Sequence, residues 1–365
     1  MNTPLDRLRA EARRTLFAPT TLAAAVQTLG FVQADPIRAP ARAQDLILRH
    51  RVRNYRAGDL EGSFARLGLE EDFLYAYGFM PAPTRNLLHP RPDPTCNAGI
   101  HAPDPLAAEV LDFVRARHTT HPRDLEAQFG RERATNNWGG FSKATTRALE
   151  SLRHYGLIRV AKRQDGIRIY AAAAPHQSEI DPEERARRLV LLVAKVLAPI
   201  SPTSLGGALA LMRHRNPGLG KMAPIVQSLL KTGALEAEPI DGETYLRPTP
   251  TTTPAPPARR DVRILAPFDP LVWDRRRFEH LWGWPYRFEA YTPPARRQMG
   301  YYAMPLLWGD AIIGWANITL PAGRLDAEIG YAGHPPRSIA FQRALDAELA
   351  RMELFLLSKA APIGG

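Results

Sequence analysis

Two polar side chains near the N-terminus, Gln33 and Asp35, have the types and the spacing needed to hold a water molecule. Pro36 disfavours the α region for the residue before it, so we expect an extended segment in which both side chains lie on one face. A carboxylate beside an amide can orient and polarise one water, the minimal equipment for displacing a good leaving group. Asp-Pro also starts many turns and Gln is common at strand edges, so these residues, taken alone, favour a structural role.

A run of cations follows this segment. Six arginines stand against one acid, Asp45, in the stretch 38–56. If residues 41–52 form a helix, Arg42, Arg49 and Arg53 lie near one face, because seven and four residues are helical offsets. A carboxylate-bearing strand that leads into a basic helix suits chemistry on a phosphate polymer, whereas a solvated helix surface is the ordinary alternative. The six arginines are Arg38, Arg42, Arg49, Arg51, Arg53 and Arg56.

The common catalytic motifs are missing. The sequence contains no phosphate-binding or dinucleotide-binding glycine loop, no nucleophile-elbow serine and no His-Glu-x-x-His pair. Residues 216–221 (Asn-Pro-Gly-Leu-Gly-Lys) echo the turn of helix-hairpin-helix DNA glycosylases, and Asp241 lies near the place of their catalytic acid. Because Asp241-Gly242 also fits the turn of an expected β-hairpin, we interpret Asp241 as a turn residue.

The composition indicates a basic globular chain with more than one domain. Its 365 residues contain 48 Lys and Arg against 37 Asp and Glu, which gives a net charge of +11. An excess of positive charge favours a polyanionic partner such as nucleic acid. The single cysteine, Cys96, excludes an intramolecular disulfide and a cysteine-based metal cluster. We find neither a signal peptide nor an apolar run long enough to span a membrane, and therefore expect a cytoplasmic protein.

One order of elements occurs twice in the middle of the chain. Three expected helices are followed by two β-prone runs around Asp165-Gly166, and the same series leads to Asp241-Gly242. Three helices and a hairpin are the order of a winged helix-turn-helix module. Five prolines between Arg247 and Arg260 then predict an extended linker.

We therefore predict an α+β fold: three tandem winged helix-turn-helix modules, and a C-terminal α/β module containing a small curved sheet. The first 80 residues fit a divergent copy of the repeat, whereas the last quarter is rich in Trp and Tyr and has strand-like runs. The predicted units are a first winged helix with the Gln-x-Asp motif (1–100), a second (101–175), a third (176–247), the linker (248–260) and the C-terminal domain (261–365).

Two stretches follow the pattern of a known family. Gln33-Ala34-Asp35 precedes Arg42-Ala43-Gln44-Asp45-Leu46, and a second block runs from Leu265 to Asp310. Both resemble the winged-helix DNA glycosylases that unhook interstrand crosslinks (the AlkZ/YcaQ type), here with the Gln-x-Asp variant of the signature. The sequence departs from this pattern at three positions. Tyr75 falls where many members have His, and Trp315 and Asn317 replace an Arg and an Asp.

The resemblance implies a monofunctional DNA repair glycosylase that hydrolyses the N-glycosidic bond of N7-alkylated purines, including those in interstrand crosslinks. Asp35 would then stabilise the oxocarbenium-like sugar and act as general base, while Gln33 orients the water, and no metal or cofactor is needed. The implied partner is double-stranded DNA, alkylated or crosslinked, bound by a monomer within the nucleoid and without contact with a membrane. The expected phosphate contacts are Arg38, Arg42, Arg49, Lys162, Arg163 and Arg168.

Two other classes of function remain open. A winged-helix transcriptional regulator would explain the charge and the repeated modules without catalysis. It would bind one duplex sequence tightly and would not depend on Asp35. A non-catalytic binder of damaged DNA would prefer lesions but lack turnover, which the changes at Trp315 and Asn317 would permit.

Overall fold

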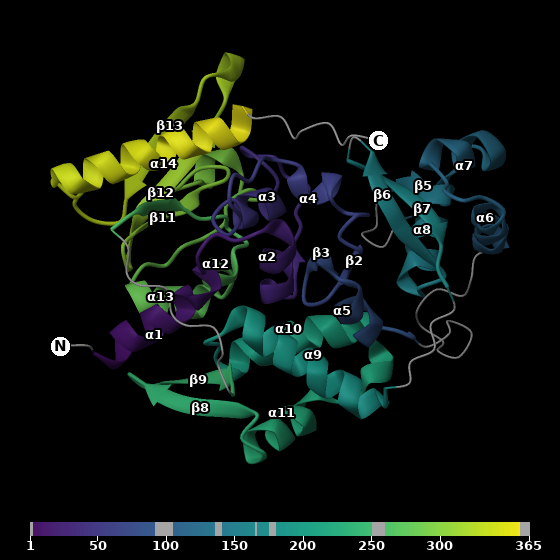
Figure 1. Ribbon diagram of the computed structural model, residues 1–365, viewed down its shortest axis with the longest axis horizontal. Coiled ribbons are helices and arrows are strands. Elements are labelled where there is room, and N and C mark those ends of the chain that lie inside the picture. Colours follow the sequence, from purple (N-terminus) through teal and green to yellow (C-terminus); the bar gives the residue numbers. More distant parts are fainter. Residues whose placement is uncertain are drawn as a thin grey trace.

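The computed structural model combines helices with small antiparallel sheets, which confirms the predicted mixed class. In Figure 1 the first module lies in the centre, between the second module on the right, the third module below and the C-terminal domain above. No helix in the described ranges is both long and apolar enough to cross a membrane. These ranges are 3–91 (first module), 105–135, 141–164 and 166–174 (second module), 180–249 (third module) and 260–357 (C-terminal domain), and they leave out most of the expected linker and Asp165.

The first module surrounds a three-stranded sheet with the strand order β1-β3-β2. Its helix α2 begins after Thr21, whose side chain accepts a hydrogen bond from the Ala24 N–H at 3.2 Å, and ends at Gly30 with φ of 72°. The helix expected at 41–52 is shorter, and β2 and β3 were not expected from the sequence. The elements are α1 (Pro4–Ala12), η1 (Arg13–Leu16), α2 (Leu22–Leu29), β1 (Val32–Gln33), α3 (Ala43–Leu48), α4 (Asp59–Gly62), β2 (Leu69–Phe73), β3 (Tyr77–Pro81) and α5 (Ala82–Leu87).

The second module has the expected three helices and hairpin, with a short strand pair added before the third helix. The third helix begins directly after this pair, because Ser142 lies in β5 and Lys143 is the N-cap. The elements are α6 (Pro105–Arg115), α7 (Pro122–Phe129), β4 (Arg133–Thr135), β5 (Phe141–Lys143), α8 (Ala144–His154), β6 (Ile158–Gln164) and β7 (Ile167–Ala172).

The third module repeats this order. Asp241 and Gly242 both have positive φ, 49° and 83°, as a tight hairpin turn requires, so the interpretation of Asp241 as a turn residue is confirmed. The elements are α9 (Pro182–Leu197), α10 (Pro202–Arg215), η3 (Pro217–Leu219), α11 (Met222–Lys231), β8 (Leu235–Ile240) and β9 (Glu243–Pro248).

The C-terminal domain is built on a four-stranded antiparallel sheet with the order β10-β11-β12-β13. The long helix α14 lies against this sheet (Figure 1). The elements are β10 (Val262–Ile264), α12 (Pro270–Trp273), α13 (Arg275–Trp282), η4 (Pro294–Arg296), β11 (Met304–Trp308), β12 (Ala311–Thr319), η5 (Pro321–Gly323), β13 (Asp326–Tyr331) and α14 (Ile339–Leu357).

A buried ion pair joins the first module to the C-terminal domain. Arg51 donates to both carboxylate oxygens of Asp269 at 2.8 and 2.9 Å, and both side chains are 0% exposed. Arg51 also donates to the carbonyls of Thr15 and Ile47, each at 2.6 Å, while Asp269 accepts from the Leu271 N–H at the start of α12. Because both charges are paired and hydrogen-bonded, this contact holds the C-terminal domain in one orientation against the first module.

Candidate active site

Strand β1 positions the Gln-x-Asp motif. It pairs antiparallel with β3, so that Val32 lies opposite Phe79 and Gln33 opposite Gly78. Val32 is buried in the core at 1% exposure, whereas Gln33 and Asp35 are half-buried. A Cβ atom at residue 78 would overlap the Val32 carbonyl oxygen, so glycine is needed for the close approach of the two strands. The extended segment predicted around Gln33 is therefore confirmed.

The two side chains of the motif have unused hydrogen-bonding capacity. Asp35 Oδ1 accepts from the Ile37 N–H at 2.9 Å, and no described residue donates to Oδ2. Gln33 Oε1 is buried and has no partner within the described part of the chain. Burial raises the pKa of Asp35, although the Ile37 N–H partly offsets this effect. Since buried polar atoms are normally hydrogen-bonded, this pair has room for a partner such as a water or a substrate.

The C-terminal domain contributes a buried hydroxyl whose pKa responds to the charge of Asp35. Burial raises the pKa of the Tyr302 hydroxyl, and the negative charge of Asp35 raises it further. Tyr302 lies two residues before β11, and its hydroxyl also has no partner among the described residues. Tyr302 lies within the C-terminal block that resembles the glycosylases, but nothing in the sequence connects it with Asp35.

Cations from the first and second modules meet around Glu61. Arg42 forms an ion pair with Glu61, and Gln44 donates to the same carboxylate at 3.1 Å. Arg163, on β6 of the second module, approaches Glu61 at 3.6 Å. At the tip of this hairpin a Cβ atom on Gly166 would clash with the Arg42 guanidinium, so the hairpin packs directly on Arg42.

Glu71 completes this contact between the modules. Its side chain is 0% exposed and accepts two hydrogen bonds from Arg163, at 2.6 and 2.7 Å, and one from Arg168 at 3.2 Å. Tyr77 also donates its hydroxyl proton to Glu71. Burial alone would raise the pKa of Glu71, but the hydrogen bonds and charges of Arg163 and Arg168 hold it below its ordinary value. Neither Glu61 nor Glu71 was singled out from the sequence.

The structure thus divides the six expected phosphate contacts into three groups. Arg38 and Lys162 are exposed and form no ion pair with a described residue. Arg42, Arg163 and Arg168 are ion-paired near the surface. Arg49 lies apart, because its side chain is 5% exposed and pairs with Glu348 of α14 at 2.8 Å. Its phosphate contact stays a prediction, but this geometry favours a structural role.

Comparison with known proteins agrees with the sequence motifs. The family described as DNA glycosylase AlkZ-like matches residues 26–355. This match covers most of the chain. The chain belongs to the AlkZ-like DNA glycosylase family. A solved structure, the Streptomyces sahachiroi DNA glycosylase AlkZ, is similar in fold, with a TM-score of 0.61, 13% sequence identity and 96% of each chain covered. Membership of the AlkZ-like family implies a DNA repair glycosylase that acts on DNA.

The three departures from the AlkZ-like pattern contribute to packing. Tyr75 is 3% exposed, and its ring packs edge-on against Trp273 with the ring centroids 5.0 Å apart. Trp315 stacks on Trp284 at 5.8 Å. Asn317 donates to the Met299 carbonyl at 2.7 Å and thereby holds the loop that leads to Tyr302. These side chains stabilise the frame around the site.

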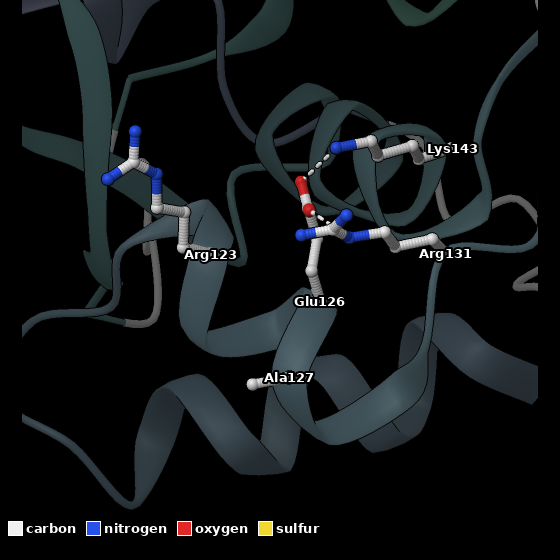
Figure 2. A pocket seen from close by; sticks show the side chains of 5 residues that line it. All are labelled: Arg123, Glu126, Ala127, Arg131 and Lys143. Carbon is white, nitrogen blue, oxygen red and sulfur yellow. Dashed lines mark hydrogen bonds and ion pairs between the residues drawn. The ribbon is translucent and has the colours of Figure 1, made fainter.

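A separate pocket lies on the second module of this AlkZ-like chain and has a volume of about 400 Å³. Figure 2 shows Glu126 between Lys143 and Arg131, with which it forms ion pairs. The carboxylate of this group is already paired with cations, whereas Gln33 and Asp35 keep unused hydrogen-bonding capacity. No set of three or more His, Cys, Asp or Glu side chains is arranged to hold a metal in the described ranges. The lining residues are Arg123, Glu126, Ala127, Arg131 and Lys143.

Proposed function

We propose that this AlkZ-like protein is a monofunctional glycosylase that hydrolyses the N-glycosidic bond of N7-alkylated purines in duplex DNA, including crosslinked ones. One observation carries the proposal: Asp35 has a half-buried carboxylate, and Gln33, two residues earlier, has a buried amide oxygen without a partner among the described residues. A raised pKa brings the Asp35 carboxylate closer to the basicity that a general base needs at neutral pH.

A site with only two proposed catalytic side chains suits this substrate. An N7-alkylated purine is cationic, so the base departs with the electron pair of the C1′–N9 bond and needs no protonation. A water then adds to C1′, and Asp35 takes the proton that the water loses. The carboxylate also stabilises the positive charge that develops on the sugar, and Gln33 Oε1 accepts the second hydrogen of the water.

We further propose that the first three modules act as winged helices on the DNA. The second and third have the element order of that motif, and the β6–β7 hairpin would be a wing. Arg38 and Lys162 are the proposed first contacts with phosphate, because they are exposed. Arg42, Arg163 and Arg168 would have to exchange their carboxylate partners for phosphate oxygens. Three modules in one chain offer a long surface, so we propose that a monomer binds the DNA.

The test is strand breakage at abasic sites. Purified protein is incubated with duplex DNA that carries N7-methylguanine or a nitrogen-mustard crosslink, and the DNA is then treated with alkali. We expect breaks with the wild-type protein and with Asp310→Asn, a control at an exposed turn. We expect none with Asp35→Asn, although its DNA affinity remains. Absence of breaks with every protein, together with tight binding, would instead favour the regulator or the non-catalytic binder.

A further inference from the structure

The loop between α13 and β11 carries exposed aromatic and basic side chains. We refer to residues 287–301 as the Arg/Tyr loop. Among the Phe, Tyr and Trp side chains that the structure describes, only Tyr291 and Tyr301 are exposed, at 81% and 45%, and both lie in this loop. Arg287 and Arg296 are exposed as well, and neither forms an ion pair with a described residue. Aromatic rings and arginines are the side chains with which proteins hold the bases and phosphates of nucleic acids.

A buried carboxylate holds the Arg/Tyr loop in one conformation. Glu289 is 5% exposed and accepts hydrogen bonds from the three consecutive N–H groups of residues 298–300, at distances between 2.7 and 3.3 Å. Within the same loop, Arg297 Nε donates to the Thr292 carbonyl at 2.8 Å. The exposed side chains are therefore presented by a backbone that is fixed before a ligand binds, which lowers the entropic cost of binding.

The exposed surface of the Arg/Tyr loop is positively charged. Glu289 is the single acid in residues 287–301, and its carboxylate is buried against the loop backbone. Of the three arginines, Arg297 lies over the Tyr301 ring, with its guanidinium carbon 5.1 Å from the ring centroid. Arg287 and Arg296 are left to meet an external anion. A duplex offers closely spaced phosphates together with flat sugar and base surfaces, so DNA fits this combination better than an acidic protein surface does.

We propose that the Arg/Tyr loop is a DNA-binding surface of the C-terminal domain, separate from the winged-helix modules. Arg287 and Arg296 contact phosphates, and the ring of Tyr291 packs against a sugar or a base. This inference rests on the proposed function, because it takes DNA as the substrate. The C-terminal domain would then hold the DNA as well as support the first module.

The test measures the affinity for a labelled duplex by fluorescence anisotropy at several salt concentrations. Arg287→Ala and Arg296→Ala should each weaken binding and reduce the slope of log affinity against log salt by about one. Tyr291→Ala should weaken binding about tenfold without changing this slope, because packing on a ring releases no counterions. Tyr291→Phe keeps the ring and should bind within about twofold of the wild-type protein.

Arg343→Ala is the matched control. Arg343 is an exposed arginine of α14 in the same domain, and the exposed acid Asp346 lies three residues further along the helix. The control should leave affinity and slope unchanged. Wild-type affinity and slope in Arg287→Ala and Arg296→Ala would overturn the proposal and would assign the loop to a partner other than DNA. An equal effect of Arg343→Ala would overturn it too, because the loss would then reflect net charge alone.

These results can be separated from the fate of the proposed function. Strand breakage after alkali tests the glycosylase, whereas the anisotropy titration tests the Arg/Tyr loop. A wild-type protein that binds the duplex but produces no breaks would refute the glycosylase function, and the loop variants would still decide the present proposal. Breakage by the wild-type protein together with unchanged binding by the loop variants would refute the loop alone.

Discussion

The pairing of Glu71 with two arginines leads to a quantitative prediction. Glu71 is fully buried and accepts hydrogen bonds from Arg163 and Arg168, and these hold the β6–β7 hairpin against the first module. Glu71→Gln keeps the shape of the side chain but leaves Arg168 without the carboxylate it pairs with, and leaves Arg163 with only the more distant Glu61 at 3.6 Å. Removing one partner of a buried ion pair costs about 3–5 kcal/mol. We therefore expect the free energy of unfolding to fall by about 3–5 kcal/mol.

The neighbouring Glu70 provides a matched control. Its nearest cations, Arg85 and Arg159, lie 3.7 Å away, and burial raises its pKa. The protein therefore gains little from ionising Glu70, and Glu70→Gln should cost less than about 1 kcal/mol. Urea unfolding of the two variants and the wild-type protein, followed by circular dichroism at neutral pH, measures both changes.

The pKa shift of Glu71 also determines whether the destabilisation by Glu71→Gln grows or shrinks as the pH falls. The pKa of Glu71 is lowered in the folded state, so its contribution is present above the unfolded pKa and disappears as the pH falls through the folded pKa. The difference between the wild-type protein and Glu71→Gln should therefore narrow in acid. If Glu71→Gln cost no more than Glu70→Gln at neutral pH, our account of the contact between the first and second modules would be wrong.

Three further predictions follow from the site. Lys162→Ala should reduce the slope of log affinity against log salt by about one, whereas Arg49→Ala should not, because the Arg49 side chain is 5% exposed and pairs with Glu348. Anisotropy titrations with labelled duplex test this, and equal slopes would contradict it. Asp35→Asn should raise the melting temperature at neutral pH, because burial raises the pKa of Asp35 and so makes its ionised form unfavourable in the folded protein. Calorimetry should show this increase in melting temperature vanish as the pH falls through the pKa of Asp35. A lower melting temperature of Asp35→Asn at neutral pH would contradict the prediction. Gly78→Ala should cost about 1–3 kcal/mol in urea unfolding through the clash with Val32, and a neutral change would count against the strand geometry.

Local rules were sufficient to predict the extended segment that carries Gln33 and Asp35, and the hairpins. Pro36 limits the backbone of Asp35, and the resulting extended segment forms the edge strand β1. Helix α9 (Pro182–Leu197) begins with a proline, whose fixed φ suits the first position of a helix, and Asp181 caps it. Asp241 and Gly242 form a tight hairpin turn with positive φ, a conformation that Asp-Gly pairs favour.

The partners of the charged side chains could not be predicted in this way. Arg163 and Glu71 are 92 residues apart, and Arg49 and Glu348 are 299 residues apart. From the sequence each arginine looked like a free surface cation, because the acid that pairs with it lies in another module. Motifs thus indicated the candidate residues, whereas their surrounding contacts required the three-dimensional arrangement.

The most direct test of the central claim is the amount of alkali-labile strand breakage that the protein produces in duplex DNA containing one N7-methylguanine. We expect breaks at the lesion with the wild-type protein and none with Asp35→Asn, while both proteins bind the duplex with similar affinity. Equal breakage by the two proteins would contradict the assignment of Asp35. Tight binding by the wild-type protein without any breakage would contradict the proposed glycosylase function.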